Sequence, residues 1–396
     1  MNSNEWRSYK LEEIAEIIGG GTPSTTNSDF WGEEIPWVTP RDLASTDERF
    51  ISRGERSITK QGLQNSSTRL LPSGTVLLTT RAPIGYLRIA TNPICTNQGF
   101  KSLIPNPQIA DNQFLFYLLK NNIEYLKSVG VGTTFAEISR STLRQIEFLF
   151  PPLSTQHRIA EILSVLDDKI ELNRQTNATL EAIAHAIFKE WFVDFNFPGA
   201  TGEMVESKLG MIPKGWRVGK LGEMITNFDR KRVPLSSRER ENRKGIFPYY
   251  GAASILDYVD DYIFDGVYLL MGEDGTVITE DGKPVLQYVS GKFWVNNHTH
   301  VLQGKKPFST EYVLLQLKNT NVKHIVTGAV QPKINQGNMN ELPVVIPDEF
   351  TLLSFQDTIT PIISNILDTE QETSILTRIR DNLLPKLVNG EIDVSN

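Results

Sequence analysis

Two stretches of this 396-residue chain repeat each other, because Gly132 matches Gly328 and the same offset of 196 positions holds as far as Trp191. Apolar residues, glycine and proline recur in type and spacing. Further matched pairs are Ile138 and Ile334, Leu143 and Met339, Pro151 and Pro347, Leu163 and Ile359, and Leu180 and Leu376. Two copies of one unit in a single chain predict pseudo-twofold structure. Such a fold suits a partner that is itself two-fold or bipartite, such as duplex DNA or a pair of identical subunits.

The stretch that precedes each constant repeat, here called the front, matches its counterpart more loosely. Trp6 resembles Trp216, and residues 74–78 resemble residues 266–270, but the offset drifts as loops are gained and lost. The fronts are therefore variable and the repeats constant. If both copies do the same kind of work, the two fronts recognise different targets and the two repeats dock the same partner.

Length and composition bound the class of protein. A chain of 396 residues exceeds one ordinary core and predicts two or more domains. No apolar run approaches the roughly 20 residues needed to cross a bilayer, and residues 1–13 lack the apolar core of a secretory signal. Cys95 is the only cysteine, which excludes an intrachain disulfide. We therefore expect a cytoplasmic protein with no membrane contact.

Charge is unevenly distributed along the chain. The net charge of −7 argues mildly against nucleic acid, since DNA-binding proteins usually show a basic footprint. Residues 228–245, however, hold seven basic side chains against three acidic ones. Such a cluster could neutralise phosphates, and the alternative is an ordinary solvated loop.

Both constant repeats carry the spacing of a coiled-coil helix. Apolar residues step by four and three positions through residues 159–191 and 355–387, which keeps one stripe facing a partner helix. The apolar seam consists of Ile159, Leu163, Leu166, Ile170, Leu180 and Ile187 in the first helix, and Ile359, Ile362, Ile366, Leu376, Leu383 and Leu387 in the second. We expect the two helices to pair antiparallel. The alternative is an amphipathic helix that lies on a globular core.

Polar residues and prolines interrupt this pattern. Asn173 and Asn177 occupy the middle of the first seam, and polar seam residues fix register at a cost in stability. Pro361 and Pro385 each remove a helical hydrogen bond in the second helix, so we expect kinks or short breaks there. The fronts contain short β-rich runs and one short amphipathic helix each, near residues 113–121 and 311–318. Each front is therefore predicted to be an α+β domain with a twisted sheet.

Catalytic signatures are absent from the sequence. The triplet Gly19-Gly20-Gly21 lacks the Lys-Ser/Thr of a Walker A loop, and no G-x-G-x-x-G follows a strand. His298-Thr299-His300 has no cysteine or acidic cluster beside it in the sequence, so we predict no metal site. Acidic turns near residues 272–275 and 280–282 suit hairpin chemistry better than magnesium.

The polar residues that remain suit DNA binding. Arginine and lysine read guanine edges, and glutamine and asparagine read adenine, through bidentate geometry in the major groove. We expect these residues on exposed loops. The candidates in the first front are Thr22, Ser24, Arg41, Arg81, Gln98, Lys101, Thr133 and Thr134. Those in the second are Arg230, Lys231, Arg232, Tyr250, His298, His300, Gln331 and Lys333.

Several motifs resemble one family. The segments FPPLSTQHRIAEIL from Phe150, IFKEWFVDF from Ile187 and LLPKLVNGEI from Leu383 are similar to the repeated regions of type I restriction–modification specificity subunits. IPWVTPRDL from Ile35 and GVGTTFAEIS from Gly130 also resemble that family, so the likeness covers essentially the whole chain. The second repeat admits two registers. The 196 offset sets Leu352 opposite Gln156, whereas a shift of one helical turn sets Gln356 there.

The resemblance implies a non-catalytic, DNA-binding subunit that reads a bipartite, asymmetric sequence with one half per target-recognition domain. It implies no cofactor in this chain. Two methyltransferase subunits bring S-adenosylmethionine, and restriction subunits that use ATP and magnesium join the same complex. The alternative, from a different class, is a coiled-coil scaffold with two protein-binding β-rich domains.

The expected fold is α+β, with two target-recognition domains alternating with two long helices. The expected boundaries are residues 1–151 for the first recognition domain, 152–195 for the first helix, 196–213 for a linker, 214–347 for the second recognition domain and 348–396 for the second helix.

Overall fold

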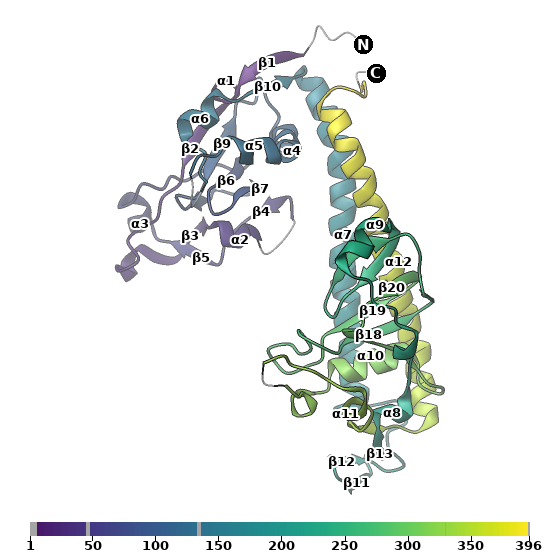
Figure 1. Cartoon of the computed structure of the whole chain (residues 1–396). Helices are drawn as coiled ribbons and strands as arrows, with labels where there is room; N and C mark the ends of the chain where they lie inside the picture. The colour runs from purple at the N-terminus through teal and green to yellow at the C-terminus, as the bar shows by residue number, and fades with distance from the viewer. Residues whose placement is uncertain (1–5, 45–47, 133–135, 329, 395–396) are drawn as a thin grey trace. The chain divides into compact units, whose positions relative to one another are not determined.

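The computed structural model describes residues 6–44, 48–132, 136–328 and 330–394. The chain forms two compact units. Unit 1 comprises Met1–Arg174 and Glu372–Asn396, and unit 2 comprises Gln175–Gln371. Each unit thus holds one front together with part of both long helices, which is the alternation predicted from the repeat (Figure 1).

The long helices are α7 (Leu153–Phe192) and α12 (Glu349–Val388), each of 40 residues. α12 continues through both Pro361 and Pro385, so of the kinks or short breaks expected at these prolines the breaks do not occur. Each proline removes one backbone hydrogen bond, and the remaining bonds with the packing of the apolar face keep the helix continuous. Within the described residues, no helix has the apolar length that a bilayer-spanning segment needs.

The helices pair antiparallel within each unit. In unit 1, Asn173 Nδ2 donates to Glu372 Oε2 at 2.8 Å, and Arg380 lies 2.7 Å from Asp167. In unit 2, the rings of Phe188 and Phe355 lie 5.8 Å apart. Along these contacts the residue numbers in α12 decrease as those in α7 increase, so the two helices run antiparallel.

All the predicted seam positions are buried or half-buried, from Ile159 to Trp191 and from Phe355 to Leu387. The apolar face is wider than a coiled-coil seam, because each helix also packs against a front. Residues outside the predicted stripe are therefore buried as well, among them Phe188, Phe192, Ile363, Leu384 and Val388.

Two observations bear on the register of the second repeat. Leu352 is 1% exposed, like Gln156, with which the 196 offset aligns it. Gln356 nevertheless makes the same kind of bond as Gln156. Gln156 Nε2 donates to the carbonyl of Ile109, ahead of the front's helix, and Gln356 Nε2 donates to that of Pro307. In α12, Leu352 therefore takes the buried position of Gln156, and Gln356, one helical turn later, makes the hydrogen bond of Gln156.

The front of unit 1 contains two sheets and several short helices. The five-stranded sheet has the order β2-β9-β6-β7-β4, and the three-stranded sheet has the order β5-β3-β8. The bounds are β2 Ala15–Gly19, β3 Trp31–Val38, β4 Phe50–Ile51, β5 Arg56–Ile58, β6 Val76–Thr80, β7 Ile84–Ala90, β8 Cys95–Thr96 and β9 Lys101–Pro105. The helices are α1 Leu11–Ile14, α2 Pro40–Ala44, α3 Lys60–Gln64, α4 Asn112–Asn121, α5 Ile123–Ser128 and α6 Arg140–Gln145.

The front of unit 2 repeats this plan with four strands in each sheet. The orders are β14-β21-β18-β19 and β16-β15-β20-β17. The bounds are β14 Ile225–Asn227, β15 Lys244–Tyr250, β16 Ile255–Val259, β17 Phe264–Asp265, β18 Tyr268–Gly272, β19 Leu286–Val289, β20 Lys292–Val295 and β21 Thr299–Gly304. The helices are α8 Leu221–Met224, α9 Ser237–Asn242, α10 Thr310–Lys318 and α11 Gln336–Asn340.

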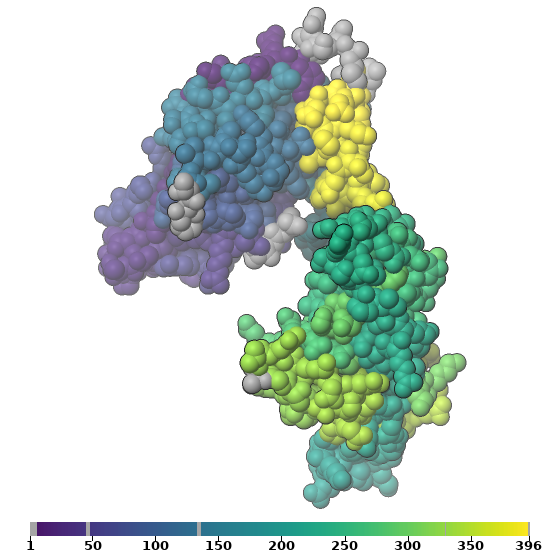
Figure 2. Space-filling view, viewed as in Figure 1, coloured from purple at the N-terminus to yellow at the C-terminus, as the bar shows by residue number. Residues whose placement is uncertain are grey.

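A two-stranded sheet closes each front at the base of its long helix. β1 (Arg7–Lys10) pairs antiparallel with β10 (Glu147–Phe150), and β13 (Arg217–Lys220) pairs antiparallel with β22 (Pro343–Ile346). The start and end of each front therefore meet. The segment predicted as a linker carries a hairpin, β11 (Met204–Ser207) with β12 (Gly210–Pro213), which projects from the rest of unit 2 (Figure 2).

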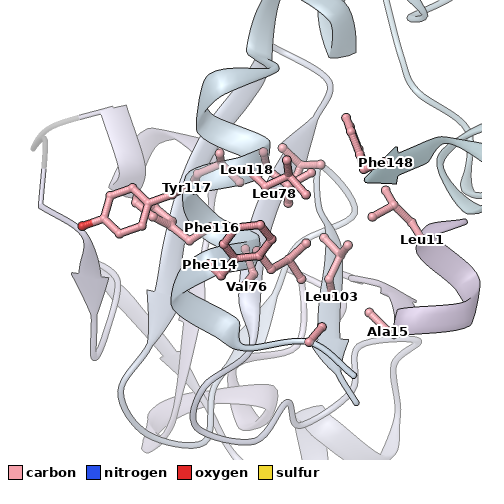
Figure 3. Packing of buried hydrophobic residues seen from close by; sticks show 14 of the residues in the cluster. Leu11, Ala15, Val76, Leu78, Leu103, Phe114, Phe116, Tyr117, Leu118 and Phe148 are labelled. Carbon is pink, nitrogen blue, oxygen red and sulfur yellow. The ribbon is translucent and has the colours of Figure 1, made fainter. Parts of the chain in front are cut away.

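The core of unit 1 joins the front to the helices. α4 lies against the five-stranded sheet, and its Phe114 and Leu118 pack with Val76 and Leu78 of β6 (Figure 3). The same cluster includes Ile159 and Leu163 of α7 with Leu384 and Leu387 of α12. Unit 2 has an equivalent cluster around α10. Each front is therefore fixed to its part of the helix pair by continuous apolar packing.

The polar centre of the seam gives a stability prediction. Asn177 Nδ2 donates to the carbonyl of Ile366 at 3.3 Å, but its buried Oδ1 has no hydrogen-bond partner. Because a buried unpaired acceptor costs free energy, we expect Asn177→Leu to raise the free energy of unfolding by about 1–2 kcal/mol. Urea titration measures this, with Asn177→Asp as the control that is expected to destabilise. An unchanged or lower value for the leucine variant would contradict the expectation.

Candidate nucleic-acid interface

Both fronts build the same corner from segments that lie far apart in the sequence. Thr80, the last residue of β6, donates its N–H to the carbonyl of Gly99 at 2.8 Å, and its own carbonyl accepts from the N–H of Ile138 at 3.0 Å. Glu273, which follows β18, donates in the same way to the carbonyl of His298 and accepts from the N–H of Ile334, both at 2.9 Å. The equivalent residues are Thr80 and Glu273, Gly99 and His298, and Ile138 and Ile334. The internal repeat therefore extends into the loops that carry most of the candidates.

The charges at this corner are reversed between the fronts. In unit 1 an acidic residue, Glu137, lies 3.6 Å from Arg81 and 3.3 Å from Lys101. In unit 2 the residue at the 196 offset is basic, Lys333, and it lies 3.3 Å from Asp274 and 3.4 Å from Glu273. One backbone frame thus presents two different arrangements of charge.

The candidates of unit 1 form two small groups and one separate site. Thr22 donates to Gln98, which joins the loop after β2 to the turn before β9. Arg81 and Lys101 share Glu137. Ser24 is exposed in the loop that Trp31 Nε1 holds by donating to its carbonyl at 3.0 Å.

Arg41 lies apart from these groups, exposed on α2, where it lines a recess with Arg53 and Phe50. Thr133 and Thr134 lie outside the described residues, on the segment between Gly132 and Ala136.

The candidates of unit 2 divide into exposed and buried residues. Arg230 and Lys231 are exposed on a short 3-10 helix, Asp229–Lys231, and His298 and Gln331 are also exposed. Arg232, Lys333 and Tyr250 are half-buried. Burial raises the pKa of Tyr250 to about 12. His300 is fully buried on β21, so the expectation that it lies on an exposed loop was wrong.

His300 is buried because it holds the corner of unit 2 together. Its Nδ1 lies 2.6 Å from Asp229 Oδ2, and its Nε2 lies 2.8 Å from the carbonyl oxygen of Ile334. Both partners are acceptors, so both nitrogens donate and the ring is an imidazolium. Burial lowers the pKa of His300, but the hydrogen bond and charge of Asp229 outweigh it and hold that pKa above its usual value.

Asp229 responds in the opposite direction. Burial raises its pKa, but the hydrogen bond from His300 and the N–H of Val301 outweigh this and hold the pKa below its usual value. Arg232 completes the network by donating to Glu273 at 2.6 Å and to the carbonyl of Thr299 at 2.7 Å. These bonds fix the backbone from which Arg230, Lys231, His298 and Gln331 project.

Asp229, Glu273 and His300 place ligand atoms within 4.8 Å of one another, the closest approach to a metal site among the described residues. Both nitrogens of His300 already donate hydrogen bonds, and the guanidinium of Arg232 lies on Glu273. A metal ligand must offer an unprotonated nitrogen. This group is therefore a buried ion-pair network.

The basic cluster of residues 228–245 is partly neutralised. Arg243 lies 2.9 Å from Asp260, and Lys244 lies 2.7 Å and Arg240 lies 3.4 Å from Asp257. These carboxylates lie on β16 and just after it, opposite β15, so the net charge of the sequence window overstates the field that DNA would meet.

Two exposed apolar residues on the same loops were not among the candidates chosen from the sequence. Val131, directly before the repeated Gly132, is 77% exposed, and Val330, two residues after its counterpart Gly328, is 99% exposed. Both glycines have positive φ. Their position at the repeat boundary is the signal that could have identified these valines. Apolar side chains of this kind contact the methyl group of thymine in the major groove.

Comparison with known proteins assigns the family. The model of the type I restriction modification DNA specificity domain matches residues 3–182 and 213–380. The chain belongs to this family. The specificity subunit of the type I restriction enzyme MjaIX from Methanocaldococcus jannaschii is 35% identical and is matched over 98% of this chain and 94% of that protein. The EcoprrI specificity subunit from Escherichia coli is 23% identical over 87% of this chain and 83% of its own length.

A solved structure agrees on the fold. The crystal structure of the S subunit of a type I restriction–modification system from M. genitalium has a TM-score of 0.63 and 18% identity, and it covers 98% of this chain and 97% of the other. The two matches to the family model coincide with the two copies of the repeat. This chain is therefore a type I specificity subunit with two related specificity domains and paired long helices, as its sequence motifs predicted.

Proposed function

We propose that this specificity subunit reads a bipartite, asymmetric DNA sequence, one half with each front, and docks methyltransferase subunits through its helices. The observation that carries this is the corner shared by the two fronts. Its backbone bonds are the same in both units, while Thr80 and Arg81 in one are replaced by Glu273 and Asp274 in the other. Two related frames with different surfaces suit two different half-sites.

The exposed candidates divide into two kinds of contact in this proposal. Arg230 and Lys231 are placed to meet phosphates, which gives affinity without sequence information. Gln98, in the turn before β9, and Gln331, in the segment before α11, are exposed and offer amides that suit adenine. Recognition domains of residues 1–151 and 214–347, helices of residues 152–195 and 348–396, and a linker of residues 196–213 fit this division of work.

The chain itself needs no catalytic group in this proposal. S-adenosylmethionine enters with the methyltransferase subunits, and ATP and magnesium enter with restriction subunits. The network of Asp229 and His300 is hydrogen-bonded throughout, and it supports a positioning role for the loops around it.

Exchange of one front tests the proposal. We expect replacement of residues 1–150 by the front of a relative to change one half of the methylated sequence and leave the other half intact. Methylome sequencing of cells that carry the methyltransferase subunit with either protein measures this, and the exchange of residues 214–347 is the matched control. A swap that alters both halves would contradict one half-site per front.

A gel-shift assay separates this function from a protein-binding scaffold. The chain with methyltransferase subunit should retain duplex DNA that carries the methylated sequence against an excess of a scrambled duplex. Equal competition by the scrambled duplex would favour the scaffold.

A further inference from the structure

The main sheets of the two units differ by one strand. In unit 1, β4 pairs parallel with β7 at the sheet edge, with Phe50 opposite Ile89. In unit 2, the described residues place no strand beyond β19, the counterpart of β7. The difference arises in one connection. Residues 39–55 join β3 to β5 and carry α2 and β4, whereas β15 turns into β16 through Gly251, whose N–H donates to Ser254 at 2.8 Å.

The residue before β4 inserts into a buried polar network of unit 1. The side chain of Arg49 is 7% exposed and donates to Tyr117 Oη at 2.8 Å and to Asp168 Oδ1 at 2.6 Å. Tyr117 donates to Asp167, which also accepts from Arg380. One arginine just before an edge strand therefore fills the space enclosed by α4, α7 and α12.

The equivalent space in unit 2 is an open cavity. The two units can be aligned through the helix N-caps Asp111 of α4 and Ser309 of α10, and through the 196 offset for the long helices. In this alignment apolar residues replace the polar network of unit 1. They are Leu315 for Tyr117, Ile363 for Asp167 and Ala184 for Arg380. All three line a cavity of about 510 Å³, together with Leu286 and Tyr288 of the edge strand β19.

The rim of this cavity carries an excess of negative charge. Glu181 of α7 and Glu370 of α12 line it, while the basic Lys318 of α10 lies 3.8 Å from Glu181. Partial desolvation of its carboxyl, and then the charge of Glu181, raise the pKa of Glu370. One lysine compensates only one of the two carboxylates, so the rim has room for one further positively charged group.

We propose that β19 and this cavity bind an extended segment of the methyltransferase subunit. The segment adds as a strand along β19 and inserts an arginine whose guanidinium meets Glu181 and Glu370. The identity of the partner rests on the proposed function, since the cavity walls are the long helices on which docking is proposed. An unpaired strand edge is a template for strand addition, and arginine suits carboxylate pairs better than lysine does. The same carboxylates repel phosphates, which argues against DNA as the occupant.

The affinity of purified methyltransferase subunit for the full chain tests the proposal. We expect the double variant Glu181→Gln/Glu370→Gln to bind at least tenfold more weakly, because a desolvated charge-assisted contact is lost. The matched control is Glu161→Gln/Asp357→Asn, which removes two exposed carboxylates of the same helices away from the cavity and should bind within twofold of wild type. Ala182→Trp, which fills the cavity from its exposed wall, should weaken binding as the double variant does.

Amide hydrogen exchange supplies an independent readout. Complex formation should slow exchange within residues 286–289 of the wild-type chain and not in the Ala182→Trp variant. The inference is overturned if the wild-type complex forms but the double variant binds as tightly and exchange in β19 is unchanged. In that case the methyltransferase subunit docks elsewhere on the chain, and the proposed docking stands. If the wild-type chain forms no complex, both the inference and the proposed docking fail.

Discussion

Replacing His300 by alanine is expected to lower the free energy of unfolding by about 3–5 kcal/mol, because removing one partner of a buried ion pair takes the nearest opposite charge from the other. Asp229 is the group left behind, and its side chain is 8% exposed. The carbonyl of Ile334 also loses its donor. Urea titration of the full chain measures the loss. His298→Ala is the matched control, since that side chain is 47% exposed and its removal should change stability by no more than about 0.5 kcal/mol.

The same variant should change how stability depends on pH. The folded pKa of His300 is raised, so its stabilisation is complete below its unfolded pKa of 6.5 and is lost as pH rises through the folded pKa. The folded pKa of Asp229 is lowered, so its stabilisation is complete above its unfolded pKa of 3.8 and is lost as pH falls through the folded pKa. The difference between wild type and His300→Ala should therefore be largest between these two values.

Unfolding titrations at pH 5 and pH 9 check this, because the difference should shrink at the higher pH. A difference that stays constant would mean that His300 contributes by packing alone. The loss should also reach function through the loops that the network holds, so that methylation of one half-site suffers while the other front is untouched.

The long-range plan of this molecule could be predicted from sequence because it depends on periodicity. The spacing of Ile159, Leu163 and Leu166 predicts a helical stripe, and the repeat at offset 196 predicts its partner. The structure confirms two paired helices and two related fronts. Pro361 misled the prediction, because packing along α12 outweighs the loss of one backbone bond.

The local chemistry of the fronts could not be predicted in the same way. His300 and His298 look alike in the sequence, and only the fold brings Asp229 to one of them. The cluster of residues 228–245 read as basic because its partners Asp257 and Asp260 lie in and just after the neighbouring strand. β4 has two residues and no detectable pattern, yet its neighbour Arg49 makes the two units differ. Pairing between strands depends on tertiary contacts that single-sequence patterns do not carry.

Lengthening both helices together is expected to lengthen the spacer between the two DNA half-sites by one to two base pairs. Four residues inserted after Asn173 would lengthen α7. The structure shows that α12 must change as well, because Asn173 pairs with Glu372 and Lys169 lies 3.0 Å from the same carboxylate. An insertion in α7 alone would slip this register. Four residues inserted after Asn173 and four inserted after Gln371 keep the flanking pairs matched.

The size of the effect follows from helix geometry. Four residues add about 6 Å and about one turn to an α-helix, so each front keeps nearly the same facing. Six ångströms correspond to about two base pairs at roughly 3.4 Å per pair along one strand of DNA. If the wild-type spacer lies at about 5 to 8 base pairs, less than the roughly 10 of one turn, the variant should prefer a spacer one to two pairs longer.

Methylome sequencing with the methyltransferase subunit reads out spacer and half-sites together. The half-sites should be unchanged, because neither front is altered. The matched control is an insertion of four residues after Leu209, in the turn of the β11–β12 hairpin, which should leave the spacer as it is. If the paired helix insertion keeps the original spacer while methylation remains, the helices do not set the separation of the half-sites. The fronts would then have to reach them through another connection.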